Sequence, residues 1–314
     1  MFWTVTNWCD YYEGPCMTEK EMVNRVPYHH ELDKQFSVDF VSPKLEAVGE
    51  RVVGYESHKS VKVESFELNR TVYVVYTASG ASGAADDIDY DLVEYIDSME
   101  PANAIIATRL VDVFNSILEE NYKEEGKRVQ AYKDIAAEEI EPALNQIDWS
   151  GSAVEVAGRL ASNLILKHAL PNANHRTAIG ICQLYLRRVN PDFSMPETAT
   201  QLDGADEYDW MEWVNEYINE SKRLLTVRRK GGRFKYLEEF GCDVLVRKHD
   251  IEISLAEYEL DLQRNERWRH YAERHEELWI DFTEEAVRRA GMTELVDNDG
   301  LTKHEFADEL KGLE

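Results

Sequence analysis

Cysteine is scarce in this chain of 314 residues, which has four in all. So few cysteines exclude a disulfide framework, and the spacing of Cys9 and Cys16 matches no common zinc site. No apolar run approaches the roughly 20 residues of a membrane-spanning helix. The start of the chain lacks a basic segment followed by an apolar one, so no signal peptide is expected. These absences favour a cytoplasmic protein without a membrane partner.

Positive charge is also scarce, because 35 lysines and arginines face 61 aspartates and glutamates, for a formal net charge of −26 at pH 7. An acidic surface repels phosphate backbones, so nucleic acid is not an expected partner. Such a surface suits a salt-rich cytoplasm, where dissolved ions screen the repulsion, and it indicates a halophilic source. The hydrophobic fraction of 43% excludes a chain that is disordered by composition.

Residues 1–100 mix strand and turn patterns and are predicted to form an N-terminal α+β region. The segments VKVESFEL (61–68) and TVYVVYT (71–77) are rich in β-branched and aromatic residues. Asn69-Arg70 between them predicts a short hairpin turn. The small, Gly-rich stretch ASGASGAAD (78–86) predicts a loop or linker.

Residues 101–228 carry a helical period and are predicted to form a helical core. From about residue 104, apolar side chains recur on one helical face: Ile106, Leu110, Val113, Phe114, Ile117 and Leu118. Residues 208–225 repeat this pattern with tryptophan and tyrosine on one side. Residues 229–314 are predicted to form a C-terminal, mainly helical region, so the fold class expected for the chain is mostly α.

The C-terminal region is predicted to follow a break in the chain. The basic, Gly-containing segment TVRRKGGR (226–233) predicts that break and a boundary. A short strand over 243–249 and a long charged helix over about 253–290 are expected after it. Thr302 and Glu305 form a capping box that predicts a last helix.

Two predicted helices of the core meet at a short polar loop. Ser152 and Glu155 form a capping box that starts the first helix. His168 falls on the buried stripe at the end of this helix, just before Pro171 stops it. A second helix restarts near Asn174. The sequence therefore predicts a helix–loop–helix corner around HALPNANHRTA (168–178).

This corner has the residue types of a phosphate site. The first N–H groups of a helix lack intrahelical partners and attract anions. Arg176, in the first turn of the second helix, could add a bidentate contact to a phosphate. His168 could accept a proton from an attacking hydroxyl, and Asn172 could offer a carbonyl oxygen to Mg²⁺.

The stretch His168-Ala-Leu-Pro-Asn-Ala-Asn-His-Arg-Thr-Ala resembles the signature of the Fic/Doc superfamily, and its ending resembles the Doc-like form. That signature is His, any residue, Phe, any residue, Asp or Glu, Gly or Ala, Asn, Gly or Lys, Arg. The resemblance covers about residues 104–225. It implies a Fic/Doc-like helical core and an enzyme that moves phosphate or AMP from ATP, with Mg²⁺, to a hydroxyl of a target protein. It also implies a possible toxin paired with an antitoxin.

The resemblance assigns a role to each motif residue. His168 would be the base, Asn172 would stand at the metal-binding position, and Arg176 would hold a nucleotide phosphate. The anion-binding loop would consist of Ala173, Asn174 and His175.

Four positions depart from the family pattern. Leu170 replaces Phe, which is an apolar exchange, and His175 replaces Lys or Gly, so that it is only partly cationic at neutral pH. Asn172 replaces the acidic metal ligand, and Ile179 stands where AMP-transferases carry a second Arg. Ile179 therefore favours a Doc-like protein over an AMP-transferase. Asn172 leaves open the alternative of a catalytically degenerate Fic-fold protein with a binding or regulatory role.

The segment near 125–150 is the expected place of the family's target-docking flap. Residues 116–121 (SILEEN) fit the family's self-inhibitory pattern, but chance explains so short a match better in a Glu-rich chain.

The RRKGGR patch (228–233) is expected to pair with the protein's own acidic surface. His270 and His275 are five residues apart and are not expected to bind a metal together.

Overall fold

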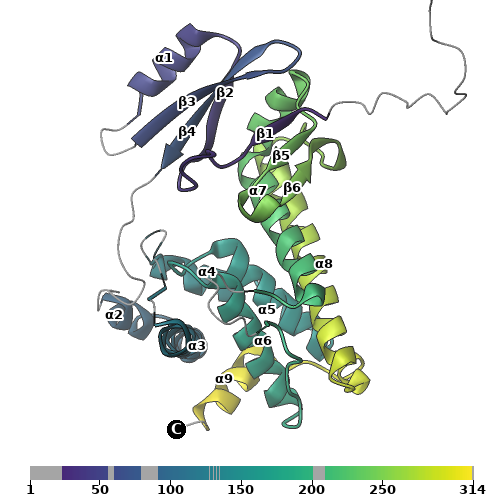
Figure 1. The fold of residues 1–314 in the computed structure, drawn as a ribbon. Helices are drawn as coiled ribbons and strands as arrows, with labels where there is room; N and C mark the ends of the chain where they lie inside the picture. The colour runs from purple at the N-terminus through teal and green to yellow at the C-terminus, as the bar shows by residue number, and fades with distance from the viewer. Residues whose placement is uncertain are drawn as a thin grey trace, which may run out of the picture.

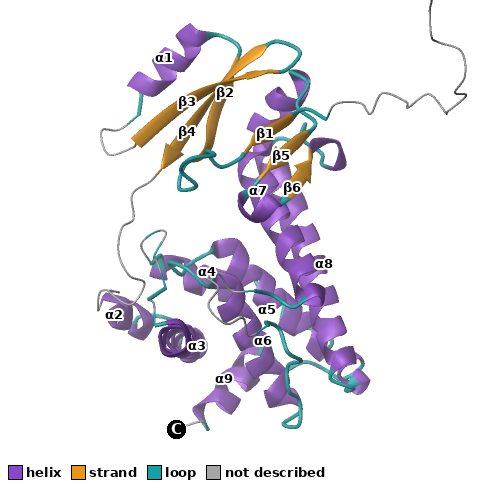
Figure 2. Ribbon diagram, viewed as in Figure 1, coloured by secondary structure: helices purple, strands orange, loops and turns teal. Residues whose placement is uncertain are grey.

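The structure is a computed structural model that describes residues 23–55, 60–78, 91–126, 128, 129, 131, 133, 135–200 and 209–312. Cys9, Cys16 and nearly all of the expected linker 78–86 lie outside these residues. Cys182 and Cys242 are buried free thiols. The predicted fold class is confirmed, because the chain is mostly helical with a smaller α+β part (Figure 2).

The N-terminal part contains an antiparallel sheet in the order β2-β4-β3. Its strands are β2 (Ser37–Ser42), β3 (Ser60–Glu67) and β4 (Thr71–Ala78), and helix α1 (Leu45–Val53) packs against it. β3 and β4 pair from Ser60↔Ala78 to Glu67↔Thr71, which confirms the predicted hairpin.

A second small sheet joins the N-terminal region to the C-terminal region. β1 (Arg25–Pro27) pairs in parallel with β5 (Val244–Val246), and β5 pairs antiparallel with β6 (Glu252–Ser254). The short strand predicted over 243–249 is thus confirmed as β5. The N-terminal region is tied to the C-terminal region through this pairing.

The helical core lies below the sheets in Figure 1. Its helices are α2 (Asp91–Asp97), α3 (Pro101–Glu125), α4 (Ile140–Asn145), α5 (Ala153–Lys167), α6 (Asn174–Val189) and α9 (Lys303–Lys311). Short 3₁₀ turns lie at η1 (Ala137–Glu139), η2 (Lys248–Asp250), η3 (Leu255–Glu257) and η4 (Thr293–Val296). The predicted capping boxes at the starts of α5 and α9 are both present. No helix in the described part of the chain is long and apolar enough to cross a membrane.

Two long helices, α7 (Glu212–Glu239) and α8 (Arg264–Arg289), pack against each other and connect the sheets to the helical core (Figure 1). On α7, Ile218 belongs to the hydrophobic cluster of the helical core, whereas Phe234 belongs to that of the sheets. The pair therefore spans both clusters.

The predicted break at 226–233 is wrong, because α7 runs through it without interruption. The glycines there serve close packing, since a Cβ on Gly231 would lie 2.8 Å from Cδ of Arg267 on α8. The predicted division at residue 228 falls inside this helix. The helix expected from about 253 begins only at Arg264, because residues 252–254 form β6 instead.

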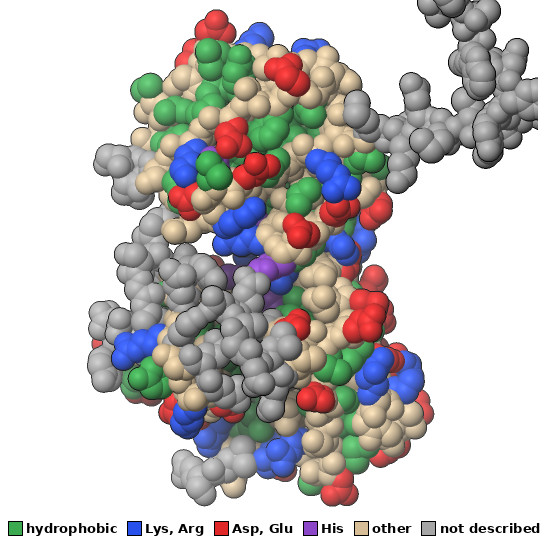
Figure 3. Space-filling model, viewed as in Figure 1, with side chains coloured by type: hydrophobic (Ala, Val, Ile, Leu, Met, Phe, Trp, Pro, Cys, Tyr) green, Lys and Arg blue, Asp and Glu red, His purple; other side chains and the backbone are tan. Residues whose placement is uncertain are grey.

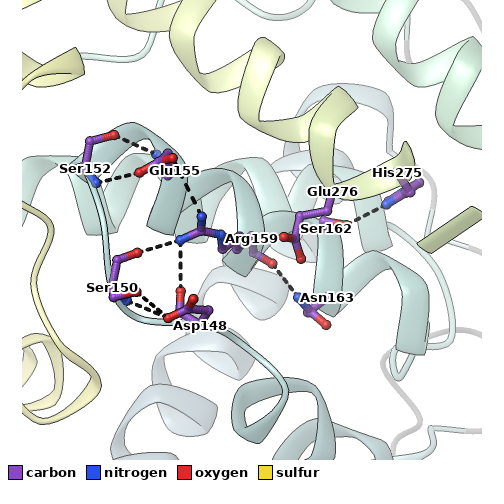
Figure 4. A network of polar contacts seen from close by, with 9 residues as sticks. All are labelled: Asp148, Ser150, Ser152, Glu155, Arg159, Ser162, Asn163, His275 and Glu276. Carbon is purple, nitrogen blue, oxygen red and sulfur yellow. Dashed lines mark hydrogen bonds and ion pairs between the residues drawn. The ribbon is translucent and has the colours of Figure 1, made fainter. Parts of the chain in front are cut away.

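Helix α5 is fixed at its start and along one side (Figure 4). The Ser152 side chain accepts from the Glu155 N–H at 3.3 Å, and the Glu155 carboxylate accepts from the Ser152 N–H at 2.8 Å. Arg159 contacts Glu276 on α8 at 3.5 Å. The capping box fixes the start of α5, and the Arg159–Glu276 contact ties α5 to α8, so the loop that follows α5 starts from a fixed helix.

Candidate functional site

The α5–α6 loop turns sharply at both of its ends. His168 caps the C-terminus of α5 with φ 52° and ψ 48°, and Ala173 precedes α6 with φ 52° and ψ 20°. Both are non-glycine residues in the left-handed region, a conformation that carries strain and persists only where the surroundings impose it. Loops of this kind are frequent at binding and catalytic sites.

The buried side chain of Asn174 closes the loop. Its Oδ1 accepts from the Leu170 N–H at 3.1 Å, and its Nδ2 donates to the Leu170 carbonyl at 3.0 Å and to the Asn172 carbonyl at 3.3 Å. Among the residues that the structure describes, no side-chain hydrogen bond caps the N-terminus of α6. The Asn174 side chain therefore shapes the loop, and the anion-attracting end of α6 is left without a capping side chain.

His168 is held in the neutral form. Burial, together with the nearby charges of Arg229 and Lys133, lowers the pKa of its imidazole to about 3. The ammonium group of Lys133 also donates to the backbone carbonyl of His168. A neutral imidazole has a free nitrogen lone pair, as a proton acceptor requires.

His175 takes part in a buried chain of hydrogen bonds. Trp279 Nε1, which can only donate, lies 3.2 Å from His275 Nε2, so this nitrogen carries no proton. The Ser221 hydroxyl therefore donates to the same nitrogen at 2.8 Å, and His275 Nδ1 donates to Ser162 Oγ at 2.7 Å. Ser221 Oγ is left to accept from His175 Nε2 at 2.9 Å. These directions fix the tautomers of both histidines.

The partial positive charge expected on His175 is not what the structure supports. Burial lowers the pKa of His175 well below its ordinary value, and the charge of Lys222 lowers it further. His175 is therefore a neutral residue fixed by Ser221, and it cannot attract a phosphate by charge. His275 lies at the centre of the hydrogen-bond chain, and among the described residues no metal-binding cluster includes it.

Arg176 points into a different space from that of His168. A groove of about 520 Å³ runs between α3 and α6, and its walls include Arg109, Ser116, Glu120, Asn121, Arg176 and Trp210. Arg176 Nη1 donates to Asn121 Oδ1 there at 3.2 Å. His168 does not line this groove. The structure therefore does not bring the two motif residues into one pocket.

A magnesium ion held by the protein does not fit the loop. Asn172 Oδ1 accepts from the Ala173 N–H at 2.6 Å, so the oxygen expected to bind a metal has a partner within the loop. No cluster of His, Cys, Asp or Glu able to hold a metal occurs in the ranges that the structure describes. Mg²⁺ prefers carboxylate oxygens, which this loop lacks.

The segment before α4, where the docking flap is expected, covers one side of the loop. Ala136 N–H donates to the Ala169 carbonyl at 2.8 Å. Val129 and Leu170 pack together with Phe114 of α3 in a small buried cluster. This segment thus supports the loop, and its pairing with a target stays a prediction.

The basic patch at 228–233 divides into two parts. Lys230 and Arg233 pair with Asp39 of β2 at 3.1 and 3.4 Å, as the sequence predicted. Arg229 is exposed and near His168, and sequence reasoning missed this relationship. The proximity depends on the tertiary packing that places α7 near the end of α5, which no local pattern reports.

Neither the curated proteins nor the solved structures contain a match to this chain. One family model does match, over residues 22–314, and its description is "Family of unknown function (DUF8172)". Because the match extends over nearly the whole chain, the protein belongs to this family.

Proposed function

We propose that the α5–α6 loop is the catalytic loop of a Fic/Doc-like transferase. The enzyme would move a phosphate-containing group from a nucleoside triphosphate to a hydroxyl of a target protein. The observation that carries the proposal is the loop closed by Asn174, which sets a neutral His168 beside the uncapped N-terminus of α6. The resemblance of residues 168–178 to the family signature supports it as well.

In this reaction the imidazole of His168 accepts the proton of the acceptor hydroxyl, whose oxygen attacks phosphorus. The bond from phosphorus to ADP or to pyrophosphate breaks, and the N–H groups of α6 stabilise the phosphate charge. A bound phosphate would offset the charges of Arg229 and Lys133 and raise the pKa of His168, which makes it a stronger base. Arg176 reaches that phosphate only after it exchanges its bond to Asn121. Any Mg²⁺ would arrive with the nucleotide.

The test uses ATP labelled at either the α- or the γ-phosphate, with cell extract as the acceptor. His168→Asn removes the imidazole and keeps a residue that tolerates the left-handed conformation. We expect it to lower labelling by roughly 100-fold or more. Arg176→Gln should also lower labelling, whereas Arg187→Gln, an exposed position on the same helix, should not. Equal labelling by wild type and His168→Asn would refute the mechanism.

A second candidate is a binding or regulatory protein without chemistry. The Asn172 oxygen that is already bound within the loop favours it, because a metal-dependent transferase needs that position. Titration calorimetry with ATP and magnesium separates the two candidates. Binding that depends on Arg176, without transfer of either label, supports the second.

A further inference from the structure

A basic crevice lies between the sheets and the helical core. Four residues lie close together there, because Arg247 affects the pKa of His29, and Arg229 affects the pKa of Arg247 and is itself affected by Tyr28. Figure 3 shows lysine, arginine and histidine side chains gathered in the hollow between the two halves of the molecule. The Arg247 guanidinium lies 5.7 Å from the centre of the Tyr28 ring. We call this space the inter-core crevice.

The arginines of the crevice lack acidic partners. In the described part of the chain, Arg229 has no hydrogen bond or ion pair, and no carboxylate contributes to the electrostatic surroundings of Arg229 or Arg247. One turn further along α7, Arg233 pairs with Asp39. In a protein with a net charge of −26, two neighbouring cations without a carboxylate form a marked local exception. Their mutual repulsion favours an anion between them.

Hydrogen-bond donors in the crevice are also unsatisfied. Arg247 uses Nη1 to contact the Lys222 carbonyl, but its buried Nε has no partner among the described residues. Neither ring nitrogen of His29 makes a hydrogen bond of good geometry within the described residues, and in the neutral imidazole one of the two carries a proton. A buried donor without a partner costs about 1–3 kcal/mol, so an acceptor that reaches these atoms is stabilised.

We propose that the inter-core crevice binds a phosphate group, with Arg229 and Arg247 as charged ligands and His29 as a neutral donor. A phosphate supplies several acceptor oxygens and a charge that matches two guanidinium groups. The ligand contacts the segment after β1, the loop after β5 and α7 together, so it links the N-terminal sheet region to α7. The crevice adjoins the α5–α6 loop, because Arg229 also lies near His168, but phosphate binding there does not depend on the proposed transfer reaction.

Calorimetry on the full chain tests this with inorganic phosphate, pyrophosphate and ATP as probes, at about 0.1 M and about 1 M KCl. We expect Arg229→Gln and Arg247→Gln each to weaken binding by roughly tenfold or more. Arg269→Gln, an exposed arginine of α8, is the charge-matched control and should leave binding unchanged. Circular dichroism checks the fold, and the exposed Arg229 keeps the test valid if Arg247→Gln unfolds. The three probes distinguish a free phosphate from one carried by a nucleotide.

Arg176→Gln separates this proposal from the proposed function. Phosphate binding that survives Arg176→Gln and is lost in Arg229→Gln supports the crevice, even if no label is ever transferred. Binding lost in Arg176→Gln and kept in Arg229→Gln assigns the phosphate to the α5–α6 loop and overturns the proposal. So does equal weakening by Arg269→Gln, or binding of a short single-stranded RNA without binding of pyrophosphate.

Discussion

Individual side chains set the geometry of the α5–α6 loop. Asn174 makes three hydrogen bonds to the backbone of the four residues before it, and these bonds satisfy both polar groups of Leu170. Trp279, a donor only, sets the direction of each hydrogen bond from Ser162 to His175. The chemistry open to His175 is thus fixed by a tryptophan with which it makes only a ring contact.

At this scale, Asn174→Ala should destabilise the protein by about 1–3 kcal/mol, because it leaves buried backbone groups of Leu170 without partners. Asn174→Asp should fall between the wild type and the alanine variant, since its oxygen can still accept from the Leu170 N–H. Urea unfolding measures the free energies. A value for Asn174→Ala within about 0.5 kcal/mol of wild type would show that the hydrogen bonds of the Asn174 side chain contribute little to stability.

The relation between helices decides where the motif residues point. His175 faces α7, whereas Arg176, the next residue of α6, faces α3. Helices α5 and α8 approach closely at Gly158, where a Cβ would lie 2.6 Å from Cα of Ile280. Because backbone atoms cannot turn aside, a side chain there must separate the helices that hold the loop in place.

At the scale of elements, Gly158→Ala should lower the free energy of unfolding by about 1–3 kcal/mol, even though alanine favours helices. Gly49→Ala on α1 is the matched control, since its Cβ would meet nothing within 4 Å. It should raise stability by up to about 1 kcal/mol. Urea denaturation of both variants gives the comparison. A Gly158→Ala protein as stable as Gly49→Ala contradicts close packing of α5 on α8.

Across the whole molecule, several histidines are buried in the neutral form. Burial lowers the pKa of His29, His168 and His275 to about 3, and that of His175 well below its ordinary value. At these four histidines, the unfolded chain binds protons below a pH of about 6.5, whereas the folded chain leaves the same imidazoles neutral. The contribution of these residues to stability is therefore complete above pH 6.5 and is lost as the pH falls toward 3.

We expect the free energy of unfolding to fall from about pH 7 to about pH 5, with uptake of about four protons on unfolding near pH 5. Each neutral histidine accounts for about 1.4 kcal/mol per pH unit. His275→Gln should remove about one proton from this uptake, whatever its effect on stability at pH 8. Urea unfolding across the pH range measures it. Stability that is level between pH 7 and pH 5 would contradict the burial of these histidines.

Local patterns determined much of the fold. The hairpin of β3 and β4, the capping boxes of α5 and α9, and the loop between His168 and Asn174 all follow from residues a few positions apart. Periodicity and capping act over one or two turns, so the sequence alone reports them. The fold class and the position of the candidate loop were therefore predictable.

Tertiary structure alone decided the rest. β1 pairs with β5 across more than two hundred residues, and α7 continues through its glycines because Arg267 of α8 packs against them. Tertiary packing also turns Arg176 toward α3 and brings Arg229 close to His168. Such relations depend on which distant surfaces meet. The residues next to a side chain along the sequence do not determine which residues contact it in the folded protein. The sequence by itself therefore determined that a polar loop joins two helices, and only the packing decided which side chains surround it.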